Sequence, residues 1–174
     1  MQDTDGQTAL QALLGRKNIN RNQISFELVQ CLTSPSNIDI QDQHGNTALH
    51  YLAARIRDFA PETSLKLLDC LISDSNIEMQ NENGHVALHF LVEAMFYDTE
   101  LGHRILTTFP SLITEKNVNL ADTCGITPYS WLLLGKKAWQ NYQSTIKMLS
   151  EVEEIFHKNG VDVDSARNGF IPAL

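Results

Sequence analysis

The feature that most constrains this chain is a glycine-centred motif that recurs at nearly constant spacing. Gly6, Gly45, Gly84, Gly125 and Gly169 each open a similar segment, and successive glycines lie 39, 39, 41 and 44 residues apart. Self-similarity at such a period indicates one supersecondary unit used several times. A single unit of this size cannot bury an apolar face by itself, so the units are expected to pack on one another.

Each unit carries the same order of local signals. Strips that alternate polar and apolar residues, at 37–40, 76–79 and 117–120, predict extended segments. An Asp-x-x-Gly segment such as 42–45 predicts a tight turn, because glycine tolerates positive φ and aspartate bonds its own backbone. Threonine then stands where a helix N-cap belongs, at Thr8, Thr47 and Thr127. Apolar residues at helical spacing follow twice, so each unit is predicted to be a hairpin and two helices.

This pattern resembles the ankyrin repeat. The resemblance is carried by Thr47-Ala48-Leu49-His50, Val86-Ala87-Leu88-His89, Thr127-Pro128 and the segments 42–45 and 159–163. It implies a mainly α fold, an ankyrin-type α-solenoid with short β-hairpin turns and about four repeats plus the start of a fifth. We expect one domain, 1–174, with repeats near 3–41, 42–80, 81–121 and 122–165 and a partial repeat at 166–174.

The chain departs from the family pattern in two ways. Its period exceeds the ankyrin value of about 33 residues, and the surplus falls mostly between the two helices of a repeat, at 57–62, 96–102 and 136–143. No polar capping repeat is visible at either end, although repeat arrays need one. We therefore expect either a fragment of a longer protein or irregular caps.

Composition and motifs narrow the function. Lysine and arginine number 13 against 21 acidic residues, a net charge of −8, which disfavours nucleic acid and membrane surfaces as partners. The three cysteines are widely spaced without a CxxC pair, which argues against a disulfide framework and favours a cytoplasmic protein. The common nucleophile, phosphate-loop, zinc-protease and dinucleotide motifs are missing. We expect no enzyme activity, no cofactor and no small-molecule substrate.

The histidines admit two interpretations. His50 and His89 recur at one repeat position, where the resemblance implies a structural histidine whose ring bonds the backbone. His44 and His85 lie near neighbouring turn tips, but no cysteine or carboxylate set completes a ligand cluster, so no metal is expected. A stack that binds a metal or a small molecule through these four residues remains an alternative.

In ankyrin-like stacks the turn tips and the exposed side of the first helices form one concave face, which implies a module that binds another protein. On this basis the expected partner-binding residues are Arg16, Gln43, His44, Asn46, Tyr51, Arg55, Glu82, Asn83, His85, Phe90 and Glu93. Tyr51, Phe90 and Trp131 recur at one repeat position. They form either an exposed aromatic ladder or packing between repeats, and packing is favoured.

A second hypothesis places the activity outside this segment. The chain would then be the repeat portion of a larger multidomain enzyme, or of a bacterial effector that is delivered into the host cytoplasm. The irregular, insertion-rich repeats and the abrupt end at 169–174 favour this hypothesis.

Overall fold

The fold is mainly α, as the sequence predicts. The structure, a computed structural model, describes residues 2–16, 24–108 and 110–163. Its longer helices are α1 (Ala9–Gly15), α2 (Phe26–Leu32), α3 (Ala48–Ala54), α4 (Pro61–Leu71), α5 (Ala87–Tyr97), α6 (Thr99–Thr108), α8 (Pro128–Ala138) and α9 (Gln143–Lys158). The connections hold four shorter helices, namely η1 (Ile56–Asp58), η2 (Asn76–Glu78), η3 (Pro110–Leu112) and α7 (Glu115–Asn119). The expected partial repeat at 166–174 lies outside the described residues.

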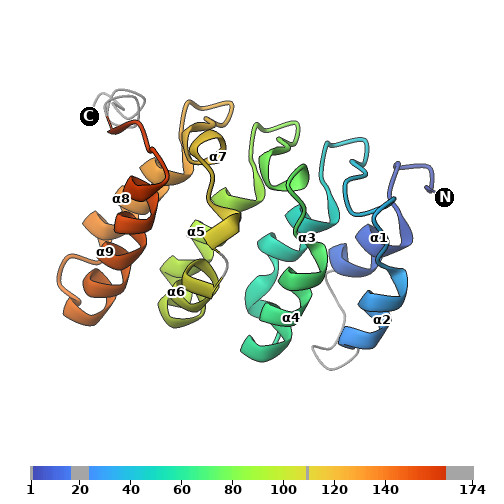
Figure 1. Cartoon of the computed structure of the whole chain (residues 1–174), viewed down its shortest axis with the longest axis horizontal. Helices are drawn as coiled ribbons and strands as arrows, with labels where there is room; N and C mark the ends of the chain where they lie inside the picture. The colour runs from blue at the N-terminus through green and yellow to red at the C-terminus, as the bar shows by residue number, and fades with distance from the viewer. Residues whose placement is uncertain (1, 17–23, 109, 164–174) are drawn as a thin grey trace.

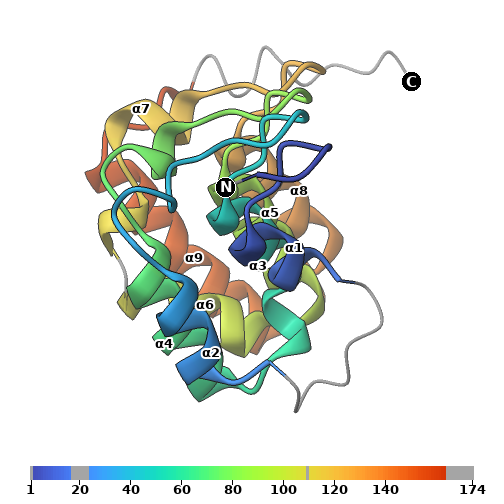
Figure 2. The ribbon, with the colours of Figure 1, turned by 90° about the vertical axis from the view of Figure 1, so that its right-hand side faces the viewer.

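The helices are arranged in pairs that follow one another along the long axis of the molecule (Figure 1). The first helices of the pairs are α1, α3, α5 and α8, and the second helices are α2, α4, α6 and α9. In the end-on view the two sets form adjacent layers, with the turns gathered at one end of the first helices (Figure 2). No helix in the described part of the chain is long and apolar enough to cross a membrane.

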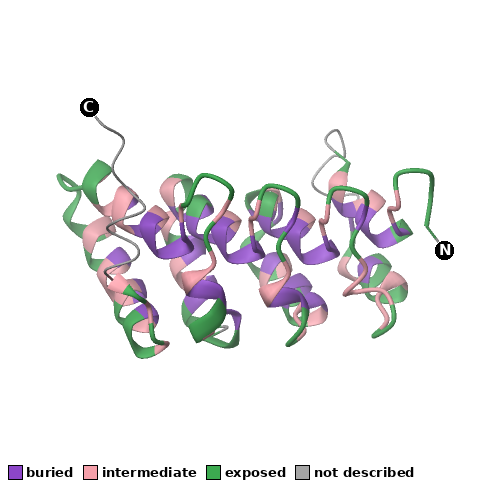
Figure 3. Ribbon diagram, turned by 90° about the horizontal axis from the view of Figure 1, so that it is seen from above, coloured by how far each residue is buried: buried purple, intermediate pink, exposed green. Residues whose placement is uncertain are grey.

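The predicted threonine caps are confirmed. The hydroxyls of Thr8, Thr47 and Thr127 accept hydrogen bonds from backbone N–H groups three residues ahead, at the start of α1, α3 and α8. Behind these caps, leucines such as Leu49, Leu52 and Leu88 are at most 2% exposed and join one continuous core between neighbouring helices (Figure 3). The caps fix where each first helix begins, and the core fixes which side of the helix faces inward.

The surplus residues of the long period mostly lengthen helices. Helices α5 and α8 have 11 residues each, against seven in α1 and in α3. The surplus at 96–102 is absorbed by the end of α5 and the start of α6, with only Asp98 between them. At 136–143 the chain leaves α8 and enters α9 after a four-residue link, 139–142.

The prediction of extended strips is wrong. Residues 76–78 form η2, and 117–119 form the end of α7. The reason lies in the asparagine that opens each strip. Asn117 Oδ1 accepts from the Thr114 N–H (2.9 Å) while its Nδ2 donates to the carbonyls of Leu112 (2.8 Å) and Ile77 (3.1 Å). An asparagine that satisfies nearby backbone groups in this way favours a turn over a strand.

The expected β-hairpins are not seen as strands either. In the described residues the β-type pairing is limited to a single antiparallel bridge between Gln2 and Thr8. Each of the four described glycine turns is instead closed by an acceptor side chain at its first residue. Asp42 Oδ1, for example, accepts from the N–H groups of His44 and Asn46 at 2.9 Å each. The backbone N–H groups of the turn thus find their acceptors within the turn and do not need a strand partner.

Two turn glycines allow the contact between neighbouring turns to be tested. Gly84 and Gly125 have φ of +76° and +81°, so alanine strains the backbone at either position. A Cβ on Gly84 would lie 2.9 Å from Cα of Asp122 in the next turn, whereas a Cβ on Gly125 has no atom of the described residues within 4 Å besides those of its own chain neighbours. We expect Gly125→Ala to cost about 1 kcal/mol and Gly84→Ala about 3 kcal/mol, because only the latter adds a backbone clash. Urea denaturation measures both, and equal costs would show that the turns do not pack tightly.

Candidate functional site

Successive turns are joined through their main chains. The N–H of Gln43 donates to the carbonyl of Asp5 (3.1 Å), that of Glu82 to His44 (2.8 Å) and that of Thr123 to Asn83 (2.9 Å). The same bond thus recurs at each of the three contacts between turns. It aligns the tips in a row, which we call the turn rim (residues 3–6, 42–45, 81–84 and 122–125).

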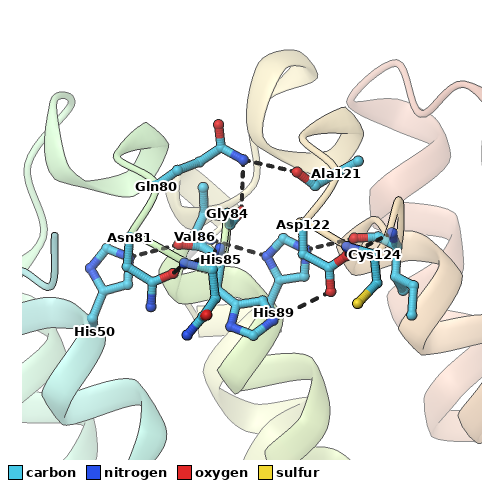
Figure 4. A network of polar contacts seen from close by, with 12 residues as sticks. His50, Gln80, Asn81, Gly84, His85, Val86, His89, Ala121, Asp122 and Cys124 are labelled. Atoms are coloured by element: carbon cyan, nitrogen blue, oxygen red, sulfur yellow. Dashed lines mark hydrogen bonds and ion pairs between the residues drawn. The ribbon is translucent and has the colours of Figure 1, made fainter. Parts of the chain in front are cut away.

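Glutamine side chains add a second set of bonds between turns. Gln41 Nε2 donates to the carbonyl of Gly45 in its own turn (2.6 Å) and to that of Gln80 in the next (3.0 Å). Gln80 repeats this arrangement with Gly84 (2.7 Å) and Ala121 (2.9 Å), as Figure 4 shows. Alanine at position 121 has no such side chain, so this series of amide bonds ends at the fourth turn.

Buried histidines form the third connection. His50 Nδ1 accepts from the Thr47 N–H (3.1 Å), and its Nε2 donates to the carbonyl of His85 (3.0 Å). His89 makes the same pair of bonds: its ring accepts from the Val86 N–H (3.1 Å), as Figure 4 shows, and donates to the carbonyl of Ile126 (3.0 Å). These rings are structural: each closes the start of its own helix and holds the turn that follows.

Burial keeps both rings neutral. It is the largest cause of the lowered pKa of His50 and lowers the pKa of His89 to about 4. A neutral ring has one acceptor nitrogen and one donor nitrogen, which is what the N–H on one side and the carbonyl on the other require.

Gln11 performs this role in the first pair, and the sequence analysis missed it. Its Oε1 accepts from the Thr8 N–H (2.6 Å), while its Nε2 donates to the carbonyls of Ile40 and Asn46 (2.7 Å each). The signal was available, because Gln11 stands 39 residues before His50. The side-chain amide of Gln11 has one acceptor atom and one donor atom, as a neutral histidine ring does, but its residue type differs from histidine.

Six of the expected partner-binding residues are exposed. They are Arg16, Gln43, His44, Glu82, Asn83 and Glu93. Within this group His44 Nδ1 lies 3.0 Å from Glu82 Oε2 across two turns. The hydrogen bond to Glu82 and then its negative charge raise the pKa of His44. Gln43 and Asn83 are the other exposed members of this group on the rim, whereas Arg16 directly follows α1 and Glu93 lies on α5.

The other five are half-buried, and most of their polar groups already have partners. The Tyr51 hydroxyl donates to Asp42 Oδ2 (2.6 Å), and burial together with that bond raises the pKa of Tyr51 to about 12. His85 Nε2 lies 3.3 Å from Asp122 Oδ2, and Asn46 Oδ1 accepts from the Asn81 amide (2.9 Å). These side chains position the rim, so they are less available to a partner than the sequence suggested.

Arg55 is another expected partner-binding residue whose polar groups are already bonded within the chain. Its side chain is 16% exposed and its Nε donates to Asp58 Oδ2 (2.9 Å). Its Nη1 reaches back to the first pair and donates to the carbonyls of Leu14 (3.0 Å) and Arg16. Arg55 therefore ties the end of α3 to the end of α1.

The three recurring aromatics do not form a ladder. Tyr51, Phe90 and Trp131 are each half-buried and pack against the core. The ring of Phe90 meets His85 (centroids 5.2 Å apart), and Trp131 meets Phe96 (6.2 Å). No ring contact joins the three aromatics in the described segments, so they fill space between neighbouring helices.

Within residues 2–16, 24–108 and 110–163 no group of three or more histidine, cysteine or acidic side chains is placed to hold a metal ion. No protein-family model matches the chain, and no curated protein matches it. Function therefore has to follow from the geometry of the turns and first helices.

Proposed function

We propose that this chain is an ankyrin-type α-solenoid module that binds another protein through the turn rim and the exposed side of the first helices. The main-chain bonds between successive turns are the observation that carries the proposal. Because backbone bonds join the turns, the side chains at the second and third positions of each turn are not needed to hold one turn against the next. Gln43, Asn83 and Thr123 are exposed there, so their identity can serve recognition.

Rigidity adds a second argument. Each turn is bonded within itself through Asp42 or its counterparts and is bonded to its neighbour through the backbone. A surface that is already ordered loses little conformational entropy when a partner binds. The rim therefore suits a partner that contacts several turns at once.

The test uses two rim substitutions and a matched pair elsewhere. Asn83→Arg with Thr123→Arg adds two charges to the rim. Gln30→Arg with Gln140→Arg adds the same charge on α2 and on the α8–α9 link, again at exposed residues. In cross-linked pull-downs, we expect a protein that is recovered with the wild type and with the matched pair but is lost with the rim variant. The three forms of the chain are expected to have equal melting temperatures, which shows that all of them fold. Identical recovery by all three proteins contradicts the proposal.

A further inference from the structure

The first helix pair, α1 and α2, lies at one end of the row and has no neighbour on its outer side among the described residues (Figure 1). Phe26 marks the inner side of α2, because Lys66 of α4 lies 5.8 Å from the centroid of its ring. Leu28 stands two positions further along, which is a rotation of about 200° on a helix. The side chain of Leu28 therefore points to the outer side, where it is 42% exposed.

Helix α1 presents apolar residues to the same side. Gln11 marks the inner side of α1, since its amide donates to the carbonyl of Asn46 in the next turn (2.7 Å). Ala9 and Leu13 each stand two positions from Gln11 and therefore point outward. Together with Leu28 they form a surface that we call the outer face of the first pair.

The second helix pair shows what covers these positions elsewhere in the array. The residues 39 positions later are Ala48, Leu52 and Leu67, and all three are 0% exposed. They lie in a pair that has another helix pair on its outer side. Ala9, by contrast, is exposed, and Leu13 is half-buried. The outer face of the first pair thus consists of apolar side chains whose counterparts are covered by helices, and covering it removes apolar surface from water.

The outer side of the fourth pair has a different chemistry. Glu151 of α9 lies 2.6 Å from His103 of α6 and therefore faces the third pair. Glu153, two positions further along, faces away from the third pair and accepts from the Tyr129 hydroxyl (3.1 Å) and from Lys136. Paired polar groups of this kind are typical of the cap at the end of a repeat array. The outer side of the fourth pair is thus a poor match for the apolar outer face of the first.

Two charges at the edge of the outer face allow two like faces to fit together. Arg16 directly follows α1 and Glu27 lies in the first turn of α2, so both lie at the end of the pair that is away from the turns (Figure 2). Both are exposed, and neither forms an ion pair in the described part of the chain. A two-fold axis parallel to the helices sets α1 of one copy against α2 of the other. Arg16 of each copy then meets Glu27 of the other copy.

We propose that two copies of this chain associate through the outer faces of their first helix pairs. The apolar residues of the two faces cover one another, and the arginine–glutamate pair forms twice by symmetry. An interface between like faces closes with two copies. Because the axis is parallel to the helices, the turn rims of both copies lie at the same end of the dimer and form one larger binding face. The association uses a surface other than the rim, so it does not rest on the proposed function.

Sedimentation equilibrium of the intact chain measures the mass of the species and the dissociation constant of the dimer. Leu28→Glu and Ala9→Arg each place a charge in the outer face at an exposed position, so one remains informative if the other folds poorly. Tyr142→Glu, which changes another exposed large hydrophobic residue on the α8–α9 link, is the matched control. Arg16→Glu, alone and combined with Glu27→Arg, tests the charge pair. Melting temperatures report whether each variant folds.

We expect a dimer for the wild type and for the control. The dissociation constant is expected to rise at least about tenfold with each outer-face variant and with the single charge variant, and to return toward the wild-type value in the double charge variant. A monomer at every concentration overturns the proposal, as does a dimer that neither folded outer-face variant weakens. Species larger than a dimer, or a double charge variant as weak as the single one, overturn the two-fold arrangement. Binding of a partner through the rim is measured separately, so loss of the dimer leaves the proposed function standing.

Discussion

Replacement of His89 by alanine is expected to lower the free energy of unfolding by about 3 kcal/mol, whereas replacement by glutamine is expected to cost at most about 1 kcal/mol. Alanine removes both the acceptor for the Val86 N–H and the donor to the carbonyl of Ile126. Val86 is fully buried, so its N–H finds no water as a substitute. The alanine variant also leaves a space where the ring was.

Glutamine is expected to be tolerated because the chain already uses it. Gln11 makes the equivalent bonds in the first pair, with the Thr8 N–H and the carbonyl of Asn46. Urea denaturation at pH 7 measures the two costs. If glutamine destabilises as much as alanine, then packing of the ring, and not its two hydrogen bonds, is what His89 contributes.

The second large effect is expected on acidification. Burial lowers the pKa of His89 from 6.5 to about 4, so the unfolded chain binds a proton at a higher pH than the folded chain does. The contribution of His89 to the free energy of unfolding is therefore fully present above pH 6.5 and is lost as the pH falls toward 4. Because one pKa unit corresponds to about 1.36 kcal/mol, His89 alone accounts for roughly 3 kcal/mol of that loss. The neighbouring charges of His85 and Asp122 act in opposite directions and are smaller causes.

His89→Gln is the variant that isolates this effect. It keeps the bonding pattern and has no proton to bind, so its stability is expected to fall much less between pH 6.5 and 4. His50, whose pKa is also lowered by burial, adds to the loss of stability. The double variant His50→Gln/His89→Gln is therefore expected to show an even weaker dependence of stability on pH. His44→Gln serves as the control, since the pKa of that exposed ring is raised and its contribution has the opposite sign. A wild-type curve that is flat from pH 7 to 4 contradicts this account.

The candidate site was predictable only in part. The exposed positions Gln43, Glu82 and Asn83 follow from their place at the tips of turns. Tyr51 and Arg55 were expected on the exposed side of a first helix, but their polar groups bind Asp42 and the end of α1.

The sequence by itself determined where the described glycine turns lie and where the first helix of each pair begins. The threonine caps, the acidic residue and glycine of each turn, and the apolar spacing all act over at most about four residues, so each can be recognised in isolation. Only the tertiary structure decided how the asparagine strips fold and which polar groups remain free. Asn117, His50 and Arg55 each bond a backbone group 35 to 41 residues away, and only the packing of one helix pair on the next selects such a partner.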